Sequence, residues 1–303
     1  MAEQAKITES TKTQFCEMRA FKRHLLRFIA STLLMCSVAH AACLGEQNTA
    51  KVYIFDVVPQ FTAAKIYTTW SPLLQRVGQE AGLCFELRVA GTIPEFEHKL
   101  LKGEPEFVFL NPYHAVLAHQ RKKYQPLLAD SAELLTGILV VRADNPIQSL
   151  DALKGKSVSF PAPNAFAASL LIRAELAKRK IDITPVFVKT HSNVYRAVIG
   201  KDTVAGGGVN NTLDNEAPEL RQQLRVLFET PAYTPHPIAT HPSVPAAVRE
   251  RFLNAMLKLT HDEQGRKLLD EVNLHKPQAV TYAKHYKPLE SLQLDKFLVL
   301  NGQ

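Results

Sequence analysis

The chain has 303 residues, of which 46% are hydrophobic and 21% charged, and its formal net charge is +7. This composition is ordinary for a globular protein, and the length suits one large domain or two lobes that each bury a core. The two short basic clusters, at residues 121–123 and 178–180, contain no aromatic residues. We therefore expect no nucleic-acid partner, whereas a mild positive excess helps to attract a small anion.

Residues 18–42 have the order of a secretory signal peptide. A basic stretch precedes an apolar run at residues 28–38, and the small-x-small sequence Ala39-His40-Ala41 follows it. The run is shorter than the roughly 20 residues that span a bilayer. We expect cleavage after Ala41, and Met18 is a better start for such a signal than Met1. The alternative is a buried N-terminal helix.

Two of the four cysteines, Cys16 and Cys36, lie in the predicted signal region, and Cys43 and Cys84 remain. Cys43 precedes the first predicted strand and Cys84 opens the second. If these strands are parallel neighbours, both cysteines lie at one sheet edge. An exported protein can form disulfides, so we predict a Cys43–Cys84 disulfide. A lipid on Cys43 is the alternative, although His40 stands where a lipoprotein signal has an aliphatic residue. Two cysteines alone make no metal site.

Apolar runs alternate with helical patterns in the first part of the chain. Gly82 and Gly103 are the expected helix ends. The predicted strands are residues 51–58, 84–89 and 106–110, and the predicted helices are residues 63–81, 93–102 and 111–120. Strands separated by helices predict a largely parallel sheet.

The same pattern then restarts. Strands are predicted at residues 137–142, 157–160, 185–189, 203–205 and 225–229, and helices at 165–180, 192–199 and beyond 245, with breaks near Gly265 and Pro277. We predict an α/β protein with a signal peptide at 1–41, lobe 1 at 42–136, lobe 2 at 137–229, and a return to lobe 1 with C-terminal helices at 230–303. The strands at 137–142 and 225–229 are the two expected crossings, and a cleft between the lobes is the expected ligand site.

Loops after the strands of the first lobe carry amide and aromatic side chains. Gln60 is expected to hydrogen-bond ligand oxygens, and Phe61 and Tyr113 to form walls of the pocket. Asn111 either contacts the ligand or only caps the following helix. His114 is expected to pack nearby.

In the second lobe, the free amides at the start of the long helix form an anion site without a charged side chain. Asn164 caps this helix, contacts the ligand, or does both. The other binding candidates are Ser169, His191, Ser192, Asn193 and Gly207. Ser192 and Asn193 could also be simple caps, and the glycines at 206–208 either let the backbone approach a ligand or form a flexible turn.

Several chemistries are missing from the sequence. It contains no phosphate-binding P-loop, no Rossmann glycine fingerprint, no Gly-x-Ser-x-Gly elbow and no His-Glu-x-x-His pair. The predicted cleft loops offer no pair of carboxylates for acid–base chemistry. We therefore expect a binding protein without catalytic residues, metal or cofactor. An enzyme on the same fold, with His191 or His114 as its base, is the alternative.

Three segments carry a resemblance to a known family. They are EFVFLNPYHAVLAH (106–119), GILVVRADNPIQSLDALKGKSVSFPAPNAFAASLL (137–171) and THSNVYRAVIGKDTVAGGG (190–208). The chain resembles the periplasmic phosphate/phosphite/phosphonate-binding components of ABC importers. This resemblance implies a type II periplasmic binding protein fold.

The resemblance also implies a function. It implies a periplasmic monomer that closes on a small anionic ligand and delivers it to a membrane permease, with a sensor kinase as the alternative partner. His191 matches the family's ligand-side histidine. The family's Ser/Thr-rich clasp is replaced here by Asn-Ala-Phe-Ala-Ala at 164–168, so another oxyanion or small solute is an open alternative.

Overall fold

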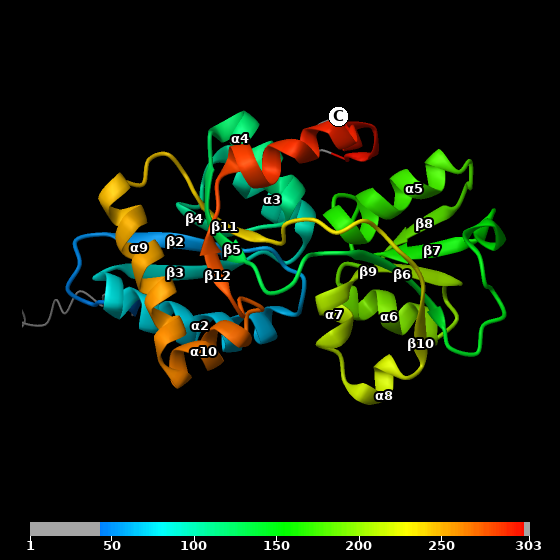
Figure 1. Ribbon diagram of the computed structural model, residues 1–303, viewed down its shortest axis with the longest axis horizontal. Helices are drawn as coiled ribbons and strands as arrows, with labels where there is room; N and C mark the ends of the chain where they lie inside the picture. The colour runs from blue at the N-terminus through cyan, green and yellow to red at the C-terminus, as the bar shows by residue number, and fades with distance from the viewer. Residues whose placement is uncertain (1–42, 300–303) are drawn as a thin grey trace, which may run out of the picture. The chain divides into compact units, whose positions relative to one another are not determined.

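The computed structural model describes residues 43–299 (Figure 1), so the predicted signal peptide and its start lie outside the described part. Residues 43–299 lie in one compact unit. Within residues 43–299, none of the helices combines the length and the apolar character that a membrane crossing requires. Two sheets organise this unit.

The first sheet, which we call sheet 1, has seven strands in the order β1-β3-β2-β4-β11-β5-β12. Their bounds are β1 (Leu44–Gly45), β2 (Val52–Val57), β3 (Cys84–Val89), β4 (Phe107–Phe109), β5 (Gln125–Asp130), β11 (Pro237–Thr240) and β12 (Pro277–Ala279). β2 is parallel to β3 and β4, whereas β1, β11 and β12 pair antiparallel. Sheet 1 is therefore mixed, with its parallel strands in one half.

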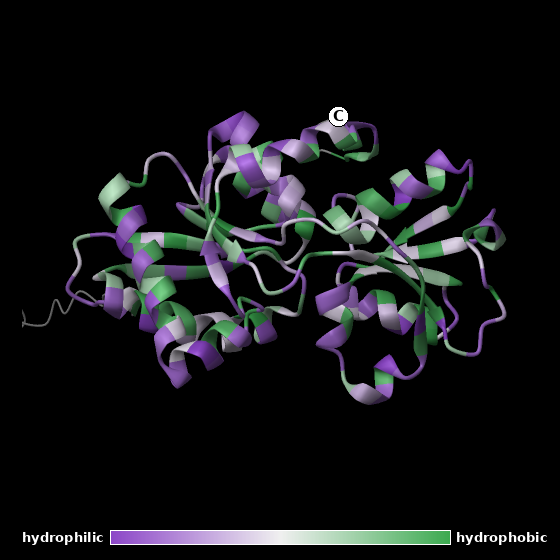
Figure 2. Ribbon diagram, in the orientation of Figure 1, coloured by the Kyte–Doolittle hydropathy of each residue, from purple (hydrophilic) through white to green (hydrophobic). Residues whose placement is uncertain are grey.

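Helices cover both faces of sheet 1, and together they form lobe 1. In Figure 1, α3 (Ile93–Lys102) and α4 (Pro112–Lys122) lie above the sheet, and α2 (Ala63–Ala81) and α10 (Glu263–Asp270) lie below it. α9 (Ala246–Lys258) packs against α2 and β5. α2 ends at Gly82, whose φ of 62° is the left-handed conformation that glycine adopts most easily. Hydrophobic and hydrophilic residues alternate along the helices (Figure 2), as expected for elements with one buried face.

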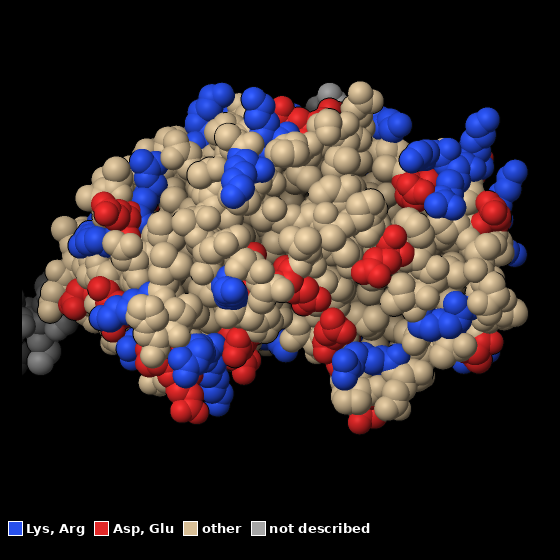
Figure 3. Space-filling view, viewed as in Figure 1, with Lys and Arg blue, Asp and Glu red and all other residues tan. Residues whose placement is uncertain are grey.

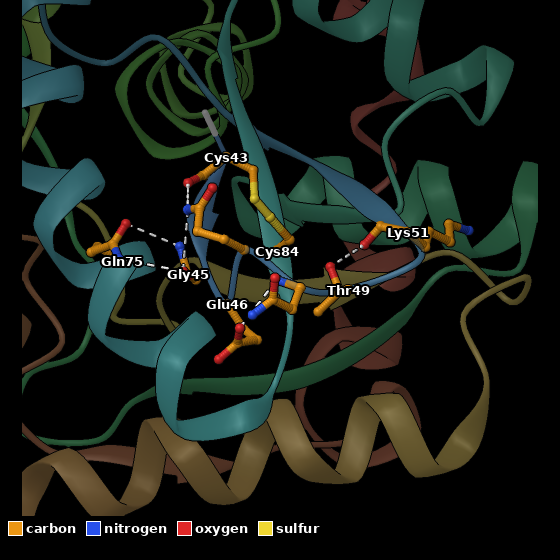
Figure 4. Close-up of a disulfide and its surroundings, with 9 residues drawn as sticks. Cys43, Gly45, Glu46, Thr49, Lys51, Gln75 and Cys84 are labelled. Carbon is orange, nitrogen blue, oxygen red and sulfur yellow. Dashed lines mark hydrogen bonds between the residues drawn. A yellow bond between two sulfur atoms is a disulfide. The ribbon is translucent and has the colours of Figure 1, made fainter. Parts of the chain in front are cut away.

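The predicted Cys43–Cys84 disulfide is present and joins the start of the described chain to β3, with 5.6 Å between the Cα atoms (Figure 4). β1 makes this possible, because it pairs antiparallel with β3 and aligns Gly45 with Cys84. The Gln75 side chain on α2 accepts a hydrogen bond from the Gly45 amide at 3.0 Å. The N-terminal segment is thus held covalently and by hydrogen bonds.

The second sheet, sheet 2, has five strands in the order β10-β6-β9-β7-β8. Their bounds are β6 (Gly137–Arg142), β7 (Ser157–Phe160), β8 (Thr184–Phe187), β9 (Ala205–Val209) and β10 (Leu224–Glu229). β7 is parallel to β8 and β9, and β6 is antiparallel to β9 and β10. All four residues of the edge strand β8 are exposed.

The helices around sheet 2 complete lobe 2. A π-helical turn, η2 (Phe166–Leu171), runs directly into α5 (Ile172–Lys178) above the sheet, and α6 (His191–Ile199) and α7 (Asn210–Asp214) lie below it (Figure 1). The short helices η1 (Leu150–Leu153) and α8 (Pro218–Arg221) lie in loops. The chain enters lobe 2 between β5 and β6 and leaves it between β10 and β11.

The C-terminal segment consists of three short helices, η4 (Tyr282–Tyr286), η5 (Lys287–Leu292) and η6 (Leu294–Phe297), and η3 (Leu259–His261) precedes α10. η4 and η5 pack on α4 of lobe 1, whereas η6 packs on η2 and α5 of lobe 2. The last described residues therefore contact both lobes. The predicted fold class, two mixed sheets flanked by helices and joined by two crossings, is confirmed, and the exact residue bounds of the lobes stay a prediction.

Some elements differ from the expectation. The short strands β1, β5, β11 and β12 were not predicted, and β12 begins at Pro277, where a helix break was expected. The glycines at 206–208 lie inside the central strand β9 rather than in a turn. A Cβ on Gly207 would lie 2.0 Å from the Ala168 carbonyl oxygen, and one on Gly208 would lie 2.3 Å from the Tyr195 hydroxyl. These glycines let η2 and α6 pack directly on the strand.

Candidate functional site

A small cavity lies where the two lobes meet. Lobe 1 contributes Val58, Gln60, Ile93, Asn111 and His236, and lobe 2 contributes Ala165, Phe166, Ala167, Ala168, His191 and Val209. Its volume is about 10 Å³, which is about the space that one water molecule needs. The lining contains no lysine or arginine. On the outer face of the molecule, acidic and basic side chains are interspersed (Figure 3).

The helix start of η2 brings backbone amides to this cavity. No hydrogen bond among the described residues uses the amides of Phe166, Ala167 or Ala168, as expected for the first turn of a helix. η2 and α5 together run without a break over residues 166–178, so the aligned peptide dipoles favour an anion at this end. Gly137 packs directly against the backbone of this turn, and it must be a glycine because a Cβ there would lie 2.3 Å from the Ala167 carbonyl oxygen.

Two buried histidines and a glutamine line the cavity, and each has side-chain polar atoms without a hydrogen-bond partner among the described residues. The side chains of Gln60 and His236 form no hydrogen bond with another described residue, and His191 uses only Nδ1, which lies 3.3 Å from the Thr212 hydroxyl. Burial lowers the pKa of both His191 and His236 to about 3. Both rings are therefore neutral near pH 7 and can each donate one hydrogen bond and accept another.

A buried hydrogen-bond network lies beside the cavity. His114 Nε2 lies 2.7 Å from Glu97 Oε1, and the Asn164 side chain donates to Glu97 Oε2 at 2.9 Å. Asn111 accepts from the His114 backbone amide at 2.7 Å and so caps α4, and its Nδ2 donates to the Asn164 carbonyl oxygen at 3.3 Å. Lobe 1 and lobe 2 are thus joined through Glu97, Asn111 and Asn164.

The structure brings three of the predicted site residues, Gln60, Asn111 and His191, into the cavity lining. Asn164 lies next to it but directs its side chain to Glu97 and Val299. Phe61 lines a separate cavity of about 20 Å³.

The other predicted residues lie outside the lining. The Tyr113 hydroxyl donates to Asp295 at 2.9 Å, and its ring is parallel to that of Phe166. Ser169 accepts from Arg173 at 3.1 Å. Ser192 donates to Glu216, and the exposed Asn193 donates to the Val188 carbonyl oxygen. Gly207 is pressed against Ala168, which leaves no space for a ligand between them.

Glu97 and His236 were not predicted. Glu97 stands with Ile93, Phe96 and Leu100 on the buried face of α3, so a charged residue at a core position of the helical pattern was the available signal. His236 lies in the proline-rich segment between β10 and β11, where its ring stacks on Phe109 with centroids 5.4 Å apart. No periodic pattern marks such a segment.

Two α/β lobes, two crossings and a cavity lined from both sides define a two-lobed binding protein of type II. Solved structures support this fold. A binding-protein component of an ABC phosphonate transporter from Pseudomonas aeruginosa is 16% identical, with a TM-score of 0.73 over 80% of this chain and 85% of that one. PhnD1 from Prochlorococcus marinus, solved with methylphosphonate, is 14% identical, with a TM-score of 0.71 over 80% and 97% of the two chains.

A more distant structure has the same fold. The ligand-binding core of GluR0 from Nostoc punctiforme, solved with L-glutamate, is 17% identical, with a TM-score of 0.52 over 73% of this chain and 97% of that one. Among curated protein sequences, none matches this chain.

The family assignment comes from the sequence model of the phosphonate ABC transporter periplasmic substrate-binding proteins, which matches residues 55–286. The chain belongs to this family. It is therefore a periplasmic substrate-binding component of a phosphonate-type ABC transporter, and the predicted family and function are confirmed at this level.

Proposed function

We propose that the cavity between the lobes binds a small oxyanion, such as a phosphonate, phosphite or phosphate, and that the protein delivers it to the permease of its ABC transporter. One observation carries the proposal. Within residues 43–299, the amides of Phe166, Ala167 and Ala168 and the side chains of Gln60 and His236 have no hydrogen-bond partner, and all five residues line one cavity formed by both lobes. Family membership supports the same ligand class.

In this proposal, the helix start, Gln60 and His191 donate hydrogen bonds to the anion, and Asn111 supports them as part of the wall. The cavity of about 10 Å³ has room for about one water molecule, so entry of a larger anion requires the lobes to separate. Closure is then driven by the higher affinity of the ligand for the closed arrangement.

We further propose that the ligand leaves chemically unchanged and that the chain acts as a monomer exported through a cleaved signal peptide. The lining offers amide, imidazole and backbone groups for hydrogen bonds to an oxyanion, and among its described residues there is no serine, cysteine, lysine or carboxylate side chain. No observation in residues 43–299 favours the sensor kinase or the enzyme alternative.

The test is calorimetric titration of the purified protein with methylphosphonate, phosphite and phosphate. At least one anion is expected to bind, and Gln60→Leu is expected to weaken binding about tenfold or more, because a buried donor to a charged group is lost. Gln222→Leu, the same exchange at an exposed position, is the matched control. Absence of binding for all three anions to the folded protein contradicts the proposal.

A further inference from the structure

Three parts of the molecule meet at the Asn164 side chain, which is 2% exposed. Its Nδ2 donates to Glu97 Oε2 of lobe 1 and to the Val299 carbonyl oxygen of the C-terminal segment, both at 2.9 Å. Its Oδ1 accepts from the Val299 amide, also at 2.9 Å. Lobe 2, lobe 1 and the C-terminal segment are therefore joined by one residue.

These contacts use the whole side-chain amide of Asn164. An asparagine offers two N–H donors and one carbonyl oxygen, and here both donors and the oxygen have protein partners. Its backbone oxygen also accepts from Asn111. The side chain therefore has no donor free for a ligand while the lobes are in this arrangement.

The C-terminal segment makes a further connection between the lobes, in addition to the two crossings. Asp295 accepts from the Tyr113 hydroxyl of lobe 1 at 2.9 Å. Two residues later, the Phe297 carbonyl oxygen accepts from Arg173 of lobe 2 at 2.9 Å, and the guanidinium carbon lies 5.6 Å from the centre of the Phe297 ring. Separation of the lobes must break contacts on one side of this segment.

We propose that Asn164 is a positioning residue that latches lobe 2 onto Glu97 and Val299, and so sets how long the ligand stays bound without touching it. This inference rests on the proposed function. Asn164 precedes the free amides at 166–168 by only two residues, so the latch also holds that helix start against Asn111 of lobe 1. A bond from an amide to a buried carboxylate is among the stronger hydrogen bonds of a protein.

A pair of substitutions that exchanges the amide and the carboxylate tests the latch to lobe 1. Asn164→Asp places a second carboxylate against Glu97 and removes the donor, so the dissociation rate of the bound anion, measured by stopped flow, is expected to rise about tenfold or more. In the double variant Glu97→Gln with Asn164→Asp, the introduced glutamine can donate to the introduced aspartate and still accept from His114. This double variant restores the bond between positions 97 and 164 but not the donor to the Val299 carbonyl oxygen, so it is expected to recover part of the wild-type dissociation rate.

A backbone pair tests the latch to the C-terminal segment. Val299→Pro removes the amide that Asn164 Oδ1 accepts from, and it is expected to raise the dissociation rate several-fold. Val299→Ala keeps both backbone bonds and trims only a half-exposed side chain, so it is the matched control and is expected to behave as the wild type. Thermal unfolding of each variant shows that it is folded.

Small-angle X-ray scattering gives a readout that needs no ligand. The latch predicts a larger radius of gyration for Asn164→Asp and Val299→Pro than for the wild type and Val299→Ala, with partial recovery in the double variant. If the variants match the wild type in both scattering and dissociation rate, the latch is wrong while the proposed function stands. If the wild type binds none of the three anions, the proposed function fails, and scattering alone decides whether the latch holds the lobes together.

Discussion

At the scale of single residues, Asp56 is a carboxylic acid that is buried away from water. It lies on the parallel strand β2 and is 4% exposed, and its Oδ1 has no partner among the described residues. Burial raises its pKa from 3.8 to about 6, although Lys99 and Arg88 act in the opposite direction. The folded state therefore binds a proton at this site more readily than the unfolded chain does.

Because the pKa of Asp56 is higher in the folded than in the unfolded state, the stability of the protein depends on pH. Between about pH 4 and pH 6, the unfolded chain releases the proton first, so the stability of the folded state falls as the pH rises. Asp56→Asn removes this penalty and is expected to raise the free energy of unfolding at pH 7 by about 1–3 kcal/mol, with a smaller gain at pH 4. Urea unfolding of both proteins at the two pH values measures the difference. An equal effect at both values would contradict the assigned cause.

At the scale of elements, strand β9 and the helix start η2 pack closely against each other. A Cβ on Gly207 would lie 2.0 Å from the Ala168 carbonyl oxygen and 2.6 Å from the Phe160 ring, and neither the helix backbone nor the buried ring can move away freely. The glycines of β9 thus determine how close the helix start of η2 comes to the sheet.

Gly207→Ala is accordingly expected to lower the free energy of unfolding by about 2–3 kcal/mol through overpacking, and to weaken anion binding by displacing η2. Thermal unfolding and calorimetric titration measure the two effects. Gly91→Ala is the control, because the nearest atom to its added Cβ is the end of the Glu95 side chain, at 3.3 Å. Equal stability of the two variants would show that the strand tolerates a side chain there.

The elements also show where sequence patterns succeed. Helices with clear periodicity, such as α2, and strands with long apolar runs, such as β6, were predicted to the residue. β11 and β12 were missed because strands of three or four residues carry no readable period. The helix start near residue 166 was predicted from the sequence, and its role as an anion site stays a prediction. The contact of Glu97 with Asn164 depends on how two lobes meet, which no local pattern encodes.

At the scale of the whole molecule, the disulfide is the one covalent link between distant parts of the described chain. It connects residues 41 positions apart, at the edge of sheet 1 where the described chain begins. Closing a loop of this length restricts the unfolded chain. Because both sulfurs belong to the disulfide, Cys43 has no thiol left for a lipid in this form of the protein.

The double exchange Cys43→Ser with Cys84→Ser is therefore expected to lower the free energy of unfolding by about 2–4 kcal/mol and to leave anion affinity unchanged, since neither cysteine lines the cavity. Denaturant unfolding of the wild type with and without reductant measures the same quantity independently. If reduction destabilises the wild type but not the double variant, the effect belongs to this bond.

The exposed edge of sheet 2, strand β8, affects how readily the protein pairs with strands of other molecules. The amides of Thr184 and Val188 point inward to Lys156 and Phe160, so the alternation along β8 turns the position of Pro185 outward. Proline has no amide hydrogen. A strand from another molecule that pairs with β8 would therefore lack one hydrogen-bond donor at this edge of the sheet. Next to the exposed apolar side chains of Val186 and Phe187, we expect this missing donor to disfavour the pairing of β8 with a strand of another molecule.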